Sequence, residues 1–185
     1  MASSQSFTIQ SELAALNRKG FLTINSQPAV NGVESSDKVF GWGGKGGYCY
    51  QKAYVECFVS PENLRRLMEG AGRRNSLNVY ACNARGEEAR CGEEGGGVTA
   101  LTWGVFPNRE VLQPTIFDPD IFFTTWSEEA FSLWTTMWLS LYHEDSESYE
   151  LIQDVRDSFY LVAIVDNEFQ RDESLWGLLL ELGKD

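Results

Sequence analysis

The chain has 185 residues, of which 43% are hydrophobic and 13% aromatic, so it is expected to fold as one domain with a sizeable core. This composition excludes an intrinsically disordered chain. The formal net charge of -12 at pH 7 argues against a nucleic-acid backbone or an anionic membrane surface as partner, because proteins that bind such surfaces present basic faces.

The 4 cysteines and 1 histidine do not have the spacing of a zinc site, since no two cysteines form a C-x-x-C pair. Cys49 and Cys57 stand in an apolar, strand-like run and are expected to be buried, reduced thiols. The start of the chain has no basic-then-apolar signal pattern, and no apolar stretch reaches the roughly 20 residues that a membrane span needs. These observations predict a cytoplasmic protein without a bound metal.

The first part of the chain predicts a helix, a strand and a loop. Apolar residues three and four positions apart predict a helix over residues 6–19, and Gly20 follows as its C-terminal stop. Alternating β-forming residues predict a strand over 21–26. Pro28 and several small polar residues predict a loop over 27–38.

Residues 41–47 contain five glycines in seven residues. A phosphate-binding loop needs a lysine that is followed by serine or threonine and then by a helix. Here Lys45 is followed by glycine, and the apolar run 48–59 that comes next is typical of a strand. The segment therefore predicts a backbone that turns tightly or approaches a ligand closely.

The rest of the chain alternates helices and strands. The predicted elements are a helix that starts at Ser60-Pro61, a strand over 76–83, a mobile glycine-rich loop over 84–97, a strand over 98–106 with an extension over 110–113, a long helix from Ser127, a helix over 147–158, a strand over 160–165 and a helix over 172–182. On the long helix, Trp134 and Trp138 belong to a wide apolar stripe, which favours a core or dimer interface over a cofactor site. Together these elements predict one mixed α/β domain with mixed strand pairing.

Acid-base machinery is scarce in the chain. His143, the only histidine, follows the long helix beside two acidic residues and is interpreted as a helix-terminus residue. Asp166 and Asn167 follow an apolar strand at a place where sites often form, but a turn cap is the better interpretation. No dinucleotide-binding fingerprint is present. The sequence therefore predicts binding rather than catalysis.

Hydroxyl groups remain as candidate ligand contacts. Thr23, Ser26, Thr102 and Thr115 can each donate and accept hydrogen bonds, which suits a zwitterionic amino-acid group. The β-propensity of threonine explains such residues on strands equally well. Composition and spacing alone leave both interpretations open.

Several ordered blocks resemble one known family over residues from about 12 to 176. The blocks are FLTINSQP at 21–28, GWG at 41–43, GGY at 46–48, QKAY at 51–54, TWGVFP at 102–107, QPT at 113–115, DP at 118–119, EAF at 129–131, LV at 161–162 and VDN at 165–167. They resemble the C-terminal regulatory domain of eukaryotic methylenetetrahydrofolate reductase. The likeness is weakest over 73–97 and at the C-terminus.

The resemblance implies a fold and a function. The fold would be two adjoining β-sheets flanked by helices, forming a single regulatory domain over 1–185 with a disordered or cloning-derived start over 1–5. In the family this domain forms the homodimer and binds S-adenosylmethionine, which inhibits the enzyme, or S-adenosylhomocysteine, which relieves the inhibition. A separate N-terminal barrel carries FAD and uses NADH or NADPH to reduce methylenetetrahydrofolate to methyltetrahydrofolate. That barrel does not lie in these 185 residues, so no cofactor and no catalytic residue are expected in them.

The resemblance also implies a ligand site. The amino-acid end of the ligand would meet Thr23, Ser26, Thr102 and Thr115, with Ile116 beside it. The family often has Glu-Thr shortly before the first helix, where this chain has Gln5-Ser6. Ser6 keeps the hydroxyl of that pair, whereas Gln5 loses the charge.

Three hypotheses follow from these observations. The first is an allosteric sensor that binds the effector and dimerises. The second is a dimerisation module whose ligand site is degenerate or incomplete. The third is a free-standing enzyme, which the scarcity of acid-base residues disfavours.

Overall fold

A computed structural model of the protein describes residues 5–34, 48–92, 103–106, 135–137, 146–166 and 173–184. Its elements, in chain order, are α1 (Gln5–Arg18), β1 (Phe21–Gln27), β2 (Val30–Glu34), β3 (Tyr48–Gln51), β4 (Tyr54–Val59), α3 (Pro61–Ala71), β5 (Leu77–Cys82), β6 (Glu88–Cys91), β7 (Trp103–Phe106), α5 (Ser146–Ser158), β8 (Tyr160–Asp166) and α6 (Glu173–Gly183). The predicted glycine segment 41–47, the extension over 110–113, His143 and Asn167 lie outside the described residues, as does the long helix except for the helical residues 135–137.

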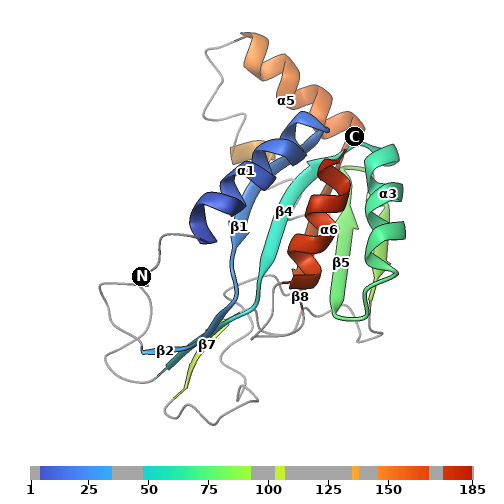
Figure 1. Ribbon diagram of the computed structural model, residues 1–185. Helices are drawn as coiled ribbons and strands as arrows, with labels where there is room; N and C mark the ends of the chain where they lie inside the picture. Colours follow the sequence, from blue (N-terminus) through green and yellow to red (C-terminus); the bar gives the residue numbers. More distant parts are fainter. Residues whose placement is uncertain are drawn as a thin grey trace.

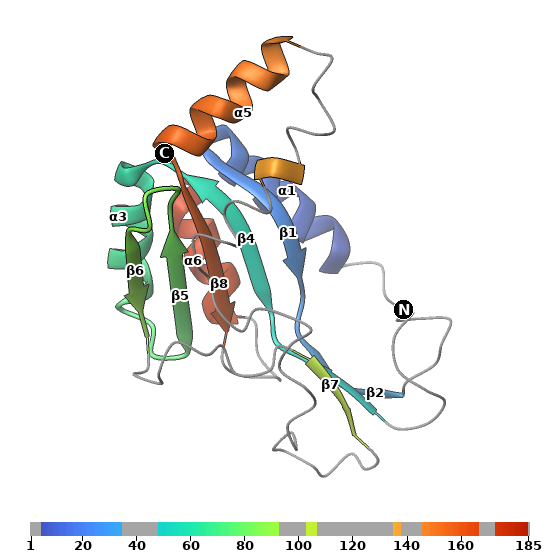
Figure 2. The same ribbon diagram turned by 180° about the vertical axis from the view of Figure 1, so that it is seen from behind.

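The strands form two sheets, a five-stranded one in the order β1-β4-β8-β5-β6 and a three-stranded one in the order β2-β3-β7. β1 leads into β2 across Pro28 and Ala29, and β3 leads into β4 across Lys52 and Ala53. Because β1 pairs with β4 and β2 pairs with β3, one antiparallel ribbon continues from the first sheet into the second (Figures 1 and 2). This arrangement confirms the predicted fold class of two adjoining sheets with helices.

The prediction of mixed strand pairing is wrong for the described strands, whose pairs are all antiparallel. β4 and β5 do point the same way, as expected of two strands joined by a helix such as α3. However, β8 from the end of the chain inserts between them and runs antiparallel to both. The pairing was therefore decided by a strand that is distant in the sequence.

Helices α1, α3 and α6 cover one face of the five-stranded sheet, and α5 lies at one end of the opposite face (Figures 1 and 2). The covered face holds the larger hydrophobic core, which includes Leu16 of α1, Leu67 of α3 and Leu178 of α6. Val155 of α5 joins a smaller cluster with Phe58 and Leu161 on the other face. Since strand side chains alternate between faces, the two clusters take alternate residues of β4 and β8.

Two predicted loops contain strands. β2 lies inside the predicted loop 27–38, and β6 lies inside the predicted loop 84–97. Both are short and carry few β-forming residues, so pairing with β3 and β5 rather than propensity makes them strands. The predicted strand over 48–59 is broken at Lys52 and Ala53, where the chain passes between the sheets.

The other predicted elements within the described residues are confirmed with shifts of one or two residues at most ends. α1 begins at Gln5, and α5, β8 and α6 start or end within a residue of the predicted ranges. The start of α3 is as expected, with Pro61 in the first turn and the Ser60 hydroxyl 3.2 Å from the backbone N–H of Asn63, which donates to it. β7 covers 103–106 of the predicted strand over 98–106, and residues 98–102 lie outside the described residues. Among the described residues, no helix combines the length and the apolar character that crossing a bilayer requires.

Candidate ligand-binding site

A β-bulge in β1 places Thr23 and Ser26 on the same face of the sheet. Residues three apart on a regular strand point to opposite faces. Here Thr23 pairs with Cys57 and Ser26 pairs with Val55, so Ile24 is an extra residue that shifts the register. Cys57 and Val55 both belong to the core under the helices. Thr23 and Ser26 therefore share the face that α1 covers.

The start of α1 lies level with the end of β1. Leu16 near the end of α1 and Phe21 at the start of β1 are packed in the same core, and the helix runs back along the strand (Figure 1). The helix rises about 1.5 Å per residue, so its 14 residues span about 21 Å. The five steps from Phe21 to Ser26 cover roughly 17 Å of strand. The first turn of α1, which contains Ser6, is thus at the level of Ser26.

Thr23 is bonded to Asn17 at the end of α1. The backbone N–H of Thr23 donates to Asn17 Oδ1 at 2.8 Å, and Asn17 Nδ2 donates to Thr23 Oγ1 at 2.9 Å. The Oγ1 to Oδ1 distance is 3.2 Å. These bonds link the helix to the strand where the bulge begins. Nothing in the spacing of the sequence points to Asn17 as a partner of Thr23.

Glu56 lies behind this part of β1, on the opposite face of the sheet. It pairs with Asn25, is 0% exposed, and its carboxylate oxygens have no hydrogen-bond partner. Burial raises the pKa of Glu56 from 4.5 to about 7, and the polar side chain of Asn25 offsets part of this effect. Asn25 Nδ2 in turn donates to the Tyr54 hydroxyl at 3.0 Å. The sequence does contain a signal for this residue, because Glu56 is the only charged residue in the otherwise apolar β4.

The Cys57 thiol and the Tyr54 phenol beside Glu56 are held in their neutral forms. Burial raises the pKa of Cys57 to about 12 and that of Tyr54 to about 12, and the charge of Glu56 adds to both effects. Cys57, Cys82 and Cys91 are free thiols, and the first two are buried. This confirms the expectation of a buried, reduced thiol for Cys57, whereas the side chain of Cys49 lies outside the described residues.

The other predicted ligand residues are only partly described. Thr102, Thr115 and Ile116 lie outside the described residues, and of Ser6 only the backbone, in α1, is described. Trp103, the residue after Thr102, pairs with Gln51 at the junction between the sheets. Gln51 also pairs with Val30, just past the end of β1. β3 therefore lies between Trp103 and Val30, and the start of β7 is at the junction but one strand removed from the chain that continues β1.

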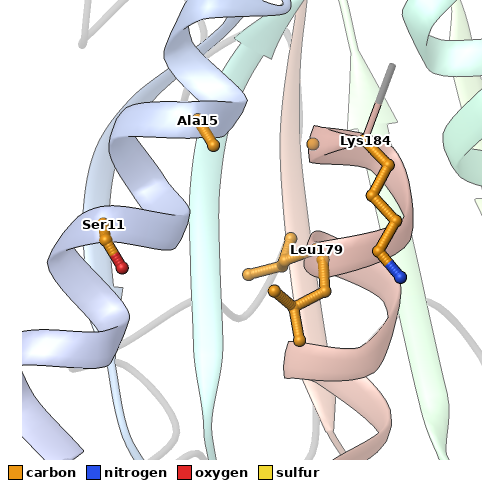
Figure 3. A pocket seen from close by; sticks show the side chains of 6 residues that line it. Ser11, Ala15, Leu179 and Lys184 are labelled. Carbon is orange, nitrogen blue, oxygen red and sulfur yellow. The ribbon is translucent and has the colours of Figure 1, made fainter.

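A groove of about 210 Å³ lies between α1 and α6 (Figure 3). Its lining residues are Ser11, Ala15, Leu179, Leu180, Gly183 and Lys184. It is smaller than the roughly 300–1,000 Å³ of typical small-molecule sites. None of the predicted ligand residues lines it, so it is separate from the candidate site.

Comparison with known proteins identifies the class of domain to which this two-sheet fold belongs, a regulatory domain. The chain matches the family described as "MTHFR, SAM-binding regulatory domain" over residues 1–184 and belongs to this family. MTHFR is methylenetetrahydrofolate reductase, and SAM is S-adenosylmethionine. The recognition of this family from the sequence blocks is thereby confirmed.

Three relatives illustrate the similarity. The chain is 46% identical over 162 residues to "Methylenetetrahydrofolate reductase (NADH) 1" of Arabidopsis thaliana, covering 87% of this chain and 27% of that protein. It is 42% identical over 173 residues to "Probable methylenetetrahydrofolate reductase (NADPH)" of Caenorhabditis elegans, covering 92% and 26%. It is 44% identical over 168 residues to "Methylenetetrahydrofolate reductase 1" of Schizosaccharomyces pombe, covering 91% and 27%. The chain spans about a quarter of the length of these curated relatives.

Proposed function

We propose that this chain is an allosteric ligand-binding domain that takes up S-adenosylmethionine as an inhibitory effector and S-adenosylhomocysteine at the same site. The observation that carries the proposal is the β1 bulge, which puts Thr23 and Ser26 on one face beside α1. Membership of a family described as SAM-binding supplies the chemical identity of the ligand.

The amino-acid end of either ligand carries a carboxylate and an ammonium group. The hydroxyls of Thr23 and Ser26 can donate to the carboxylate, and Ser6, Thr102 and Thr115 are proposed to complete the contacts, with Ile116 alongside. The first turn of α1 has no acidic residue, so the positive end of its helix dipole favours a bound carboxylate.

We extend the proposal to the whole polypeptide on the basis of the relatives' names. The parent protein would reduce methylenetetrahydrofolate to methyltetrahydrofolate, with FAD and NADH or NADPH bound in an N-terminal barrel. In this division of labour residues 1–185 form the regulatory domain, catalyse nothing themselves and mediate homodimerisation. Free thiols at Cys57, Cys82 and Cys91 support a cytoplasmic location for the protein.

Calorimetry and thermal unfolding of the 185-residue chain test the proposal. At a free ligand concentration of about 100 times Kd, a ligand that binds only the folded state adds about 2.7 kcal/mol of stability. For a chain of this size we expect a rise in melting temperature of roughly 5–10 °C with either ligand. If neither ligand changes the melting curve and the chain is dimeric, the dimerisation-only hypothesis replaces this one.

A further inference from the structure

The orientation of the Asn17 amide is set by its bonds to Thr23. A backbone N–H can only donate, so the Asn17 atom 2.8 Å from the Thr23 nitrogen is the oxygen Oδ1. The atom 2.9 Å from Thr23 Oγ1 is then Nδ2. Since an amide nitrogen only donates, the Thr23 hydroxyl accepts this bond. The hydroxyl therefore donates its own hydrogen, and the acceptor within reach in this structure is Asn17 Oδ1, at 3.2 Å.

Two acceptors compete for the Thr23 hydroxyl hydrogen when a ligand is bound. The first is Asn17 Oδ1, but the distance of 3.2 Å is long for an O–H···O bond, and this oxygen already accepts from the Thr23 backbone. The second is an anionic group of the ligand. Hydrogen bonds to ionised acceptors are roughly twice as strong as those between neutral groups. An approaching carboxylate therefore takes this hydrogen from Asn17.

We propose that Asn17 is a positioning residue for the ligand site: by donating to Thr23 Oγ1, it makes this hydroxyl a donor that faces the carboxylate, not the ammonium, of the bound amino-acid group. The inference rests on the proposed ligand class and assigns a direction to one of its contacts. The contact between the end of α1 and the start of the β1 bulge then contributes to ligand recognition as well.

Two substitutions separate this role from a structural one. In Asn17→Asp, a carboxylate oxygen still accepts from the Thr23 backbone N–H, so the link between α1 and β1 is kept. The aspartate cannot donate, however, and its second oxygen attracts the hydroxyl hydrogen away from the ligand. In Asn17→Ala the link is lost, but the hydroxyl is free to turn toward the ligand. A structural role predicts more damage in Asn17→Ala, whereas the positioning role predicts weaker binding in Asn17→Asp.

The measurement is calorimetric titration of the wild-type chain and both variants with two probes. S-adenosylhomocysteine carries the amino-acid group, and 5′-methylthioadenosine keeps the nucleoside and the thioether but lacks that group. We expect Asn17→Asp to bind S-adenosylhomocysteine about 10- to 100-fold more weakly than wild type, because a charge-assisted hydrogen bond is lost. Asn17→Ala should lose less than about 10-fold, and affinity for 5′-methylthioadenosine should stay within about 2-fold in both.

A double variant distinguishes an effect of Asn17→Asp that acts through the Thr23 hydroxyl from direct repulsion between the new aspartate and the ligand carboxylate. Without the hydroxyl in Thr23→Val, adding Asn17→Asp should have little further effect on S-adenosylhomocysteine if Asn17 acts through Thr23. Plain charge repulsion would persist in that background and would overturn the inference. Equal affinity of wild type and Asn17→Asp, or a greater loss in Asn17→Ala, would also overturn it. If the wild-type chain binds neither probe, the proposed function fails as well.

Discussion

Replacing Glu56 with glutamine should stabilise the protein much more at pH 8 than at pH 5. The carboxyl is completely buried, and burial raises its pKa from 4.5 to about 7. Between pH 4.5 and about pH 7, Glu56 loses its proton in the unfolded chain but keeps it in the folded chain. The free energy of unfolding therefore falls as the pH rises through this window, and the loss is complete above pH 7. Glutamine has nearly the same shape and no charge, so the variant escapes this loss.

The size of the effect follows from the two pKa values. One pKa unit corresponds to about 1.4 kcal/mol, so the shift from 4.5 to about 7 lowers the unfolding free energy by roughly 3 kcal/mol at pH 8. At pH 5, which is only slightly above the lower of the two pKa values, the unfolding free energy is lowered by about 1 kcal/mol. The difference in stability between Glu56→Gln and wild type should therefore grow by roughly 2.5 kcal/mol between pH 5 and pH 8.

Urea unfolding of both proteins at a series of pH values measures this difference. Other titrating groups are common to both proteins, so their contributions cancel in the stability difference. Tyr54 and Cys57, with pKa values of about 12, do not titrate between pH 5 and pH 8. Glu150→Gln, which removes an exposed carboxyl on α5, controls for the change in net charge. A stability difference that does not vary between pH 5 and pH 8, or a less stable Glu56→Gln at pH 8, would refute the reasoning.

Four further outcomes are expected. Thr23→Val should bind S-adenosylhomocysteine about 10- to 150-fold more weakly, since a hydroxyl partner of a charged group is lost. Thr136→Val, at an exposed helical position, is its matched control, and equal affinities in calorimetry would contradict the assigned site. Gly92→Ala should lower the melting temperature by several degrees, because Gly92 has φ of 125° and an added Cβ would lie 2.0 Å from Asn78 Oδ1; an unchanged unfolding curve would count against this. Light scattering at micromolar concentration should give the mass of a homodimer, and a monomer mass would reject that part of the proposal. The purified chain should lack both a flavin absorbance band and reductase activity, and the presence of either would show that it is more than a regulatory domain.

Much of the fold follows from local sequence patterns. The period of three and four in α1, the Ser60-Pro61 start of α3 and the apolar run of β8 each specify an element through interactions within a few residues. The blocks that identify the family are likewise readable in the sequence. β2 and β6 are not, because they become strands only by pairing with β3 and β5.

The candidate site depends on tertiary structure in a way that local patterns do not reveal. The sequence supplies Thr23 and Ser26, but their spacing of three would separate them on a regular strand. The register of β1 against β4 excludes Ile24 from the pairing and returns both hydroxyls to one face. Asn17 reaches Thr23 only because α1 packs back along β1, and the pKa of Glu56 is raised because the residues of β4 are buried on both faces of the sheet. The sequence by itself therefore determined the family and the candidate residues for the proposed ligand site, whereas packing between distant segments decided which side chains meet and in what electrostatic environment.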